Sequence, residues 1–110
     1  MRKDLIAEVG IDQTGRFYIM PSSVKFPYIY REAMEVHWDA KENFLHSPAA
    51  QRALSWGWTY LDWFKQITNA AEEQSCSLRV SKATRWNNVP ESLKKQILEW
   101  SEVYYSNLDK

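Results

Sequence analysis

SWGWTYLDWFKQITNAAEEQ, residues 55–74, combines aromatic side chains with the periodicity of an amphipathic helix. Thr59 and Asp62 have the spacing of a capping box, so we predict a helix from Thr59 to about Gln74. A helical wheel gathers the apolar side chains on one wide face, which we interpret as the side that meets the core. That face contains Trp56, Tyr60, Leu61, Trp63, Phe64, Ile67, Ala70 and Ala71.

Trp58 does not fit this face, because the same wheel places it among the polar residues. Gly57 and the Thr59 cap favour a helix that begins after Trp58, with the indole folded back over the core. The alternative is an indole that faces solvent, and an exposed tryptophan is typical of a contact surface. We therefore keep Trp58 as a candidate binding residue.

The residues before this helix predict strands. Residues 4–20 predict a β-hairpin with turn residues at 12–15, and its first strand alternates at period two through Leu5, Ala7, Val9 and Ile11. Residues 28–39, YIYREAMEVHWD, predict a third strand with one apolar and one charged face. A helix over residues 30–36 is the alternative, because Glu, Ala and Met favour helices. Residues 44–47, FLHS, predict a short return strand.

The residues after the helix predict one more strand, CSLRVS at 76–81, and a second helix over 87–108. Asn88 is the expected cap of that helix, and its apolar stripe consists of Leu93, Ile97, Trp100, Tyr104 and Leu108. Ser47 and Pro48 could begin a further short helix or remain in a loop.

These elements predict a single α+β domain spanning residues 1–110. We expect a mostly antiparallel sheet of about five strands with two helices packed on one face, in the order ββββαβα. A chain of 110 residues can bury one hydrophobic core. Its six tryptophans, six tyrosines and four phenylalanines must supply much of that core, so few can be spared for the surface.

Composition excludes several classes of function. The formal net charge is zero, which argues against phosphate-driven nucleic-acid binding and against a polybasic membrane anchor. Cys76 is the only cysteine, so we expect a buried thiol in a reducing, cytoplasmic protein without a disulfide or a cysteine-rich zinc site. With three glycines the sequence has no phosphate-binding loop, and we expect no cofactor and no bound metal.

One constellation could carry chemistry. On the charged face of the predicted strand over 28–39 lie Arg31, Glu35, His37 and Asp39. His37 beside Asp39 could be a general base with its orienting carboxylate, or two metal ligands with His46 as a third. A solvated strand face is the simpler interpretation. Glu32 interrupts the apolar face, and we expect it at the strand edge, near the entrance to a pocket.

Two aromatic features remain. Tyr28 and Tyr30 form an aromatic edge at the start of the same predicted strand and are candidate contact residues. A basic stretch contains Arg79, Lys82 and Arg85, followed by Trp86. Cations beside an aromatic ring suit single-stranded nucleic acid. A solvated connector with Trp86 in the core is the alternative, and nucleic acid is not the expected partner.

Three runs carry a family resemblance: LIAEVGIDQTGRFYIMPSS, FPYIYREAMEVHWD and WTYLDWFKQI. Together they resemble small bacterial proteins of unknown function that are encoded on mobile integron gene cassettes. The resemblance covers most of the chain. It implies a bacterial cytoplasmic origin, an α+β fold and an accessory role, and it assigns no activity to any residue.

The sequence therefore supports a small accessory binding or interaction module, self-associating as a homo-oligomer such as a dimer. Its partner would be another protein or a small apolar or aromatic ligand, and no membrane is expected. The alternative is a small-molecule-binding protein or enzyme with an aromatic-lined cleft between sheet and helices. Single-stranded nucleic-acid binding ranks third.

Overall fold

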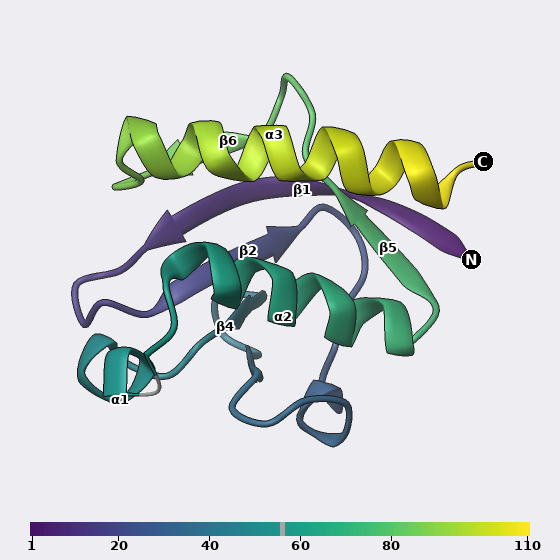
Figure 1. Ribbon diagram of the computed structural model, residues 1–110. Helices are drawn as coiled ribbons and strands as arrows, with labels where there is room; N and C mark the ends of the chain where they lie inside the picture. Colours follow the sequence, from purple (N-terminus) through teal and green to yellow (C-terminus); the bar gives the residue numbers. More distant parts are fainter. Residues whose placement is uncertain (56) are drawn as a thin grey trace.

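The computed structural model describes residues 1–55 and 57–110 (Figure 1). Its strands are β1 (Arg2–Ile11), β2 (Phe17–Pro21), β3 (His37–Asp39), β4 (Phe44–His46), β5 (Cys76–Arg79) and β6 (Arg85–Asn87). Its helices are η1 (Ile29–Arg31, a 3₁₀-helix), α1 (Ala50–Ser55), α2 (Tyr60–Glu73) and α3 (Glu91–Leu108). The predicted α+β class is confirmed, and α2 and α3 lie on the same side of the sheet.

The strands form one mixed sheet in which β1 is central. The order is β3-β4-β2-β1-β5, and β6 pairs with β1 beyond the part that β5 covers. Three neighbouring pairs are antiparallel, whereas β5 and β6 run parallel to β1. The predicted hairpin is confirmed: Gly15 adopts a φ of 81°, and Asp12 accepts hydrogen bonds from the backbone of Thr14 and Arg16.

The predicted alternation along β1 is wrong in its first half. Between Ile6 and Glu8 the pairing with β2 shifts, which is the signature of a β-bulge. An extra residue in one strand moves the following side chains to the other face. Ile6 and Val9 are therefore the large apolar residues that this strand buries, and Leu5 is 50% exposed.

The predicted strand over residues 28–39 is also wrong, except for β3 at its end. Residues 29–31 form η1, with hydrogen bonds from Arg31 N–H to the Tyr28 carbonyl and from Glu32 N–H to the Ile29 carbonyl. Glu35 then adopts a φ of 62°. The turn is favoured over a strand because it folds the backbone back on itself. In this conformation Phe26, Ile29 and Val36 all reach the core.

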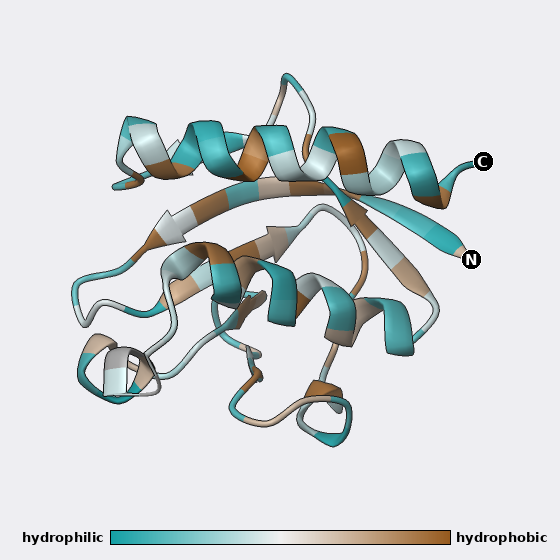
Figure 2. Cartoon of the chain, viewed as in Figure 1, coloured by the Kyte–Doolittle hydropathy of each residue, from teal (hydrophilic) through white to brown (hydrophobic). Residues whose placement is uncertain are grey.

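The helix at residues 60–73 matches its prediction closely. Thr59 is the N-cap of α2 and forms the expected capping box with Asp62. Trp63, Phe64 and Ile67 are fully buried, and the hydrophobic side of the helix faces the sheet (Figure 2). Trp58 precedes the helix and packs against the core, as the first interpretation expected. Trp56 lies outside the described residues.

The C-terminal helix follows its prediction in the first half only. Leu93 and Ile97 are buried, but Ser101 and Tyr105 continue the buried row, while Leu108 is exposed. Ile97, Ser101 and Tyr105 are four residues apart and so form one row along the helix. Trp100 and Tyr104 lie at the margin of this row and are half-buried. Asn88 does not cap α3: it has a φ of 60°, and Pro90 occupies the N-cap position.

Two further local predictions differ from the structure. Ser47 caps no helix, because α1 begins at Ala50 and the buried Ser47 hydroxyl instead accepts a hydrogen bond from Phe17 N–H. Trp86 lies in β6, which the sequence interpretation assigned to a connector. No helix in residues 1–55 and 57–110 is long and apolar enough to span a membrane.

Candidate functional site

The sheet face turned away from α2 and α3 gathers polar and aromatic side chains from five strands, and we call it the open face. Side chains alternate between the two faces of each strand, and paired residues point to the same face. The observed registers therefore bring residues of this face side by side, for example Gly10 opposite Tyr18 and Tyr18 opposite His46. The open face contains Glu8, Gly10, Tyr18, Met20, His37, Asp39, Phe44, His46, Arg85 and Asn87.

Tyr18 lies across Gly10 at the centre of this face. Its ring stacks on Phe44 with 4.4 Å between centroids, and only 4% of the residue is exposed. The phenol donates a 2.6 Å hydrogen bond to Glu8 and accepts one of 2.9 Å from the Asn87 amide. Burial, reinforced by the Glu8 carboxylate, raises the pKa of Tyr18 to about 12. The phenol therefore stays protonated as a structural donor.

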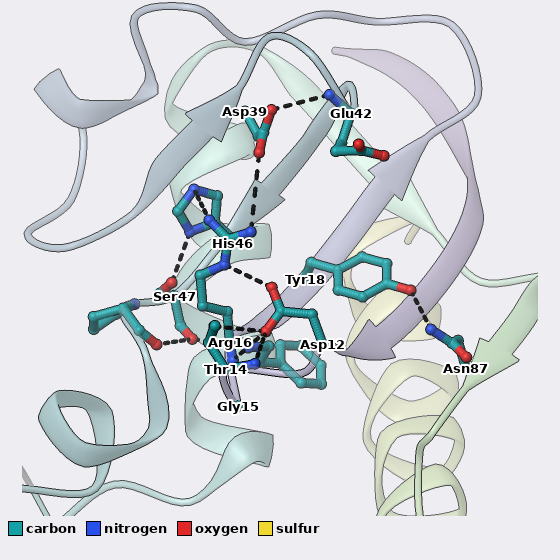
Figure 3. Close-up of polar contacts among 12 residues, drawn as sticks. Asp12, Thr14, Gly15, Arg16, Tyr18, Asp39, Glu42, His46, Ser47 and Asn87 are labelled. Atoms are coloured by element: carbon teal, nitrogen blue, oxygen red, sulfur yellow. Dashed lines mark hydrogen bonds and ion pairs between the residues drawn. The ribbon is translucent and has the colours of Figure 1, made fainter.

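Arg16 organises the neighbouring part of the open face (Figure 3). Its guanidinium lies 2.6 Å from the Asp12 carboxylate, 3.9 Å from the Asp39 carboxylate and 5.7 Å from the Phe44 ring centroid. Burial opposes ionisation of Asp12, but hydrogen bonds from Arg16 and Thr14 outweigh it and lower the pKa of Asp12. Backbone N–H donors, led by that of Glu42, lower the pKa of Asp39.

His46 is the half-buried imidazole of this cluster. Its Nδ1 lies 2.7 Å from the Ser47 carbonyl oxygen, and its Nε2 lies 3.5 Å from the Arg16 guanidinium. A neutral ring with the proton on Nδ1 satisfies both contacts. Burial, together with Arg16 and His37, lowers the pKa of His46, although the Ser47 contact acts in the opposite direction.

The lowered pKa of His46 predicts a pH-dependent stability. Below the ordinary pKa of about 6.5 the unfolded chain binds a proton that the folded chain resists, so stability should fall as pH drops from about 6.5 toward the folded pKa. Arg16 and His37 face the ring and oppose its protonation, whereas Asp39 favours it. Urea unfolding between about pH 7.5 and 5 should show a smaller loss of stability in His46→Asn than in the unchanged chain. Equal slopes would contradict this assignment.

The four residues predicted to share a charged face do not form one site. Glu35 contacts His37 at 3.2 Å and forms an ion pair with Arg52, which is the main reason its pKa is lowered. Arg31 lies instead over the rings of Tyr28 and Tyr30. Of the four, the open face keeps His37 and Asp39.

The rings of His37 and His46 are paired across β3 and β4, with centroids 5.4 Å apart. The described residues nevertheless contain no group of three or more His, Cys, Asp or Glu side chains that could hold a metal ion. Glu32, expected near a pocket at a strand edge, is half-buried beside the end of α2 and accepts a 2.9 Å hydrogen bond from Gln74.

A second candidate surface surrounds η1, and we call it the aromatic segment: Tyr28, Tyr30, Arg31 and Met34. The guanidinium of Arg31 lies 4.8 Å from the ring centroid of Tyr28 and 5.9 Å from that of Tyr30. The two tyrosine rings contact each other edge to face at 6.5 Å. All four residues are exposed. Trp58, the other predicted contact residue, is half-buried and lies 4.8 Å from the Trp63 ring.

Two of the three cations of the basic stretch are engaged within the chain, and the third, Lys82, is exposed. Arg79 makes two 2.8 Å hydrogen bonds to Asp109, and Arg85 pairs with Glu8 at 3.1 Å. Trp86 is half-buried, packs against the core and receives Lys94 over its ring at 5.5 Å. These contacts agree with the simpler interpretation, in which Trp86 belongs to the core and two of the arginines are neutralised.

Comparison with known proteins gives the family. The model of the family Integron Cassette Protein Hfx_Cass5 matches residues 4–84. The chain belongs to this family. A solved structure of Hfx_Cass5 comes from the mobile metagenome of North West Arm Sewage Outfall, and its sequence is 40% identical to that of this chain. The alignment covers 93% of this chain and 98% of that one, with a TM-score of 0.45. A search of curated proteins finds no match.

The expected resemblance to integron cassette proteins is thus confirmed, and membership of the Hfx_Cass5 family brings no described activity. The Hfx_Cass5 match includes the aromatic segment and most of the open face. The sequence interpretation missed Tyr18, Phe44 and Arg16 as members of one surface. Period-two alternation around Phe17 could have placed Tyr18 on the outer face, but its neighbours depend on the strand order.

Proposed function

We propose that this member of the Hfx_Cass5 family is a small protein-interaction module whose contact surface is the aromatic segment. The observation that carries the proposal is exposure: Tyr28 is 55% exposed, Tyr30 59% and Met34 71%. Neighbouring large side chains with this exposure are typical of contact surfaces. Tyr, Met and Arg are also the residue types enriched where proteins meet.

The contacts within the aromatic segment support a binding role. Arg31 lies over the rings of Tyr28 and Tyr30, and these contacts restrict its orientation before a partner arrives. A preformed arrangement reduces the entropy that binding must overcome. Arg31 has no ion-pair partner among the described residues, which leaves its charge available for a carboxylate of the partner.

The open face supports a structural role more than a catalytic one. Arg16 is bound by Asp12 and Asp39, and the Tyr18 phenol is engaged by Glu8. Groups that satisfy one another in this way are costly to redirect toward a substrate. We assign this network to the stability and rigidity of the sheet on which the aromatic segment is presented.

Self-association and a cytoplasmic location complete the proposal. The formal net charge of zero gives little repulsion between copies. Cys76 is a free thiol that is buried against the core, and burial raises its pKa, so it is inert as a nucleophile. A reducing compartment agrees with a lone thiol of this kind.

Partner capture with matched variants tests the proposed contact surface. The bait is the whole chain, compared with Tyr28→Ala/Tyr30→Ala and with Val103→Ala, a variant at a 64% exposed apolar residue of α3. We expect a specific partner to be retained by the unchanged chain and the Val103 variant and lost by the double variant. With the purified partner, loss of two hot-spot rings should weaken binding by roughly 30-fold or more. Equal affinity of all three forms would refute the assignment.

A further inference from the structure

One flank of α3 carries an ordered row of charges around an exposed apolar residue. Lys94, Leu98 and Glu102 are spaced by four residues, so they lie one above another on the helix surface. Leu98 is 40% exposed in the middle of this row. Lys94 and Glu102 form no ion pair within residues 1–55 and 57–110. Lys94 lies over the Trp86 ring at 5.5 Å, so neither charge is neutralised by an opposite charge of the same copy.

The surface is hollowed on both sides of this row. Three shallow hollows of about 430, 530 and 330 Å³ meet at Leu98, which lines all of them. Glu102 borders two of the hollows and Lys94 borders two. On the sheet side, Val80 and Trp86 provide apolar walls. A ridge of side chains approaching α3 would therefore find both space and apolar surface beside Leu98.

The order of the charges indicates the occupant. In two helices packed antiparallel about a two-fold axis, residues at equal distances before and after the axis face each other. With Leu98 on the axis, Lys94 of one copy faces Glu102 of the other, and the reverse pair forms as well. We propose that a second copy of this chain docks on this flank of α3 as an antiparallel, two-fold dimer.

The order of Lys94 and Glu102 favours an antiparallel copy over a uniformly charged helix. A basic helix would meet Lys94, and an acidic helix would meet Glu102, so either would place like charges together. A parallel copy would set lysine against lysine. Because only one helix face from each copy takes part, the interface falls at the small end of specific interfaces, and we expect a dissociation constant in the micromolar range.

This inference rests on the self-association included in the proposed function and adds the surface that produces it. Light scattering over a dilution series from about 1 µM to about 1 mM spans the expected dissociation constant. The unchanged chain should be a dimer at the concentrated end and a monomer at the dilute end. Lys94→Glu alone and Glu102→Lys alone should each weaken the dimer at least tenfold, because each places two like-charge pairs across the axis.

Mixing the two single variants gives the decisive result. In a mixed pair every charge meets its opposite, so Lys94→Glu and Glu102→Lys should form a heterodimer although each alone is monomeric. The double variant Lys94→Glu/Glu102→Lys should recover the homodimer. Val103→Asp, on another side of α3, is the control and should leave the dimer unchanged, and circular dichroism of each variant verifies the fold. No preference for the mixed pair would overturn the proposed surface.

The outcomes separate this inference from the proposal it rests on. A chain that is monomeric at every concentration overturns both the dimer and self-association, while partner capture by the aromatic segment stands or falls by its own test. A dimer that survives the α3 variants but is lost in Tyr28→Ala/Tyr30→Ala overturns the α3 surface alone. Leu98→Asp provides a second check, because a charge on the axis should abolish the dimer whatever the pairing of the lysine and the glutamate.

Discussion

Phe17→Ala should lower the free energy of unfolding by about 3–5 kcal/mol, a large part of the roughly 5–15 kcal/mol that holds a protein of this kind together. The ring projects from β2 toward α2 and is fully buried, with centroid distances of 5.9 Å to Tyr60 and 6.4 Å to Phe64. Removing the ring leaves a cavity at the junction of sheet and helix, and the hydrogen bonds that join the Phe17 backbone to Ser47 oppose its collapse.

Urea unfolding monitored by tryptophan fluorescence measures this loss, and Val103→Ala is the matched surface control. Val103 is 64% exposed, so its truncation should change stability by no more than about 0.5 kcal/mol. A loss below about 1.5 kcal/mol for Phe17→Ala would show that the contact between α2 and the sheet is looser than described.

Gly10→Ala should cost about 2–4 kcal/mol, although it adds one methyl group to a strand. A Cβ at position 10 would lie 2.3 Å from the Cζ and the hydroxyl oxygen of Tyr18. The ring cannot swing away, because it is buried against Phe44 and bonded to Glu8. The substitution therefore either strains the strand or expels Tyr18 and leaves Glu8 without its short hydrogen bond.

A double-mutant cycle isolates this clash. In a Tyr18→Val background the ring is absent, and Gly10→Ala should change stability by less than about 0.5 kcal/mol. The difference between the two backgrounds measures the coupling between positions 10 and 18. A Gly10→Ala cost that is the same with and without the Tyr18 ring would contradict the packing described for the open face.

The elements that the sequence predicted well are those specified by neighbouring residues. The capping box at Thr59 and Asp62 fixes the start of α2, and the 3.6-residue repeat fixes its buried side. The hairpin of β1 and β2 is likewise encoded by its own turn, in which Gly15 takes a positive φ. In each case the decisive contacts join residues that are close in the chain.

The elements that were missed depend on contacts between remote residues. Residues 28–36 have the alternating pattern of a strand. Ile29 and Val36 nevertheless pack together in the core with residues of other elements. The bulge near Ala7 is visible only once β2 sets the register. The open face also depends on remote contacts. Tyr18 contacts Phe44 and Asn87 because of the strand order, which the spacing of residues in the sequence does not indicate. The sequence nominated Tyr28 and Tyr30 as contact residues, but the position of Arg31 over their rings depends on the turn of η1.

The parallel pairing of β1 has a consequence for how the chain matures as it leaves the ribosome. β1 emerges first and can close with β2 at once, but its other edge waits for β5 and β6, which are translated far later. Until then Arg2–Leu5 and Glu8–Gly10 present open backbone donors and acceptors to any neighbouring nascent chain. Charged side chains at Arg2, Lys3 and Glu8 then serve a second purpose, because they discourage premature edge-to-edge pairing. Completion of the sheet is therefore a late event of biogenesis, since these two pairings close the longest loops between paired strands.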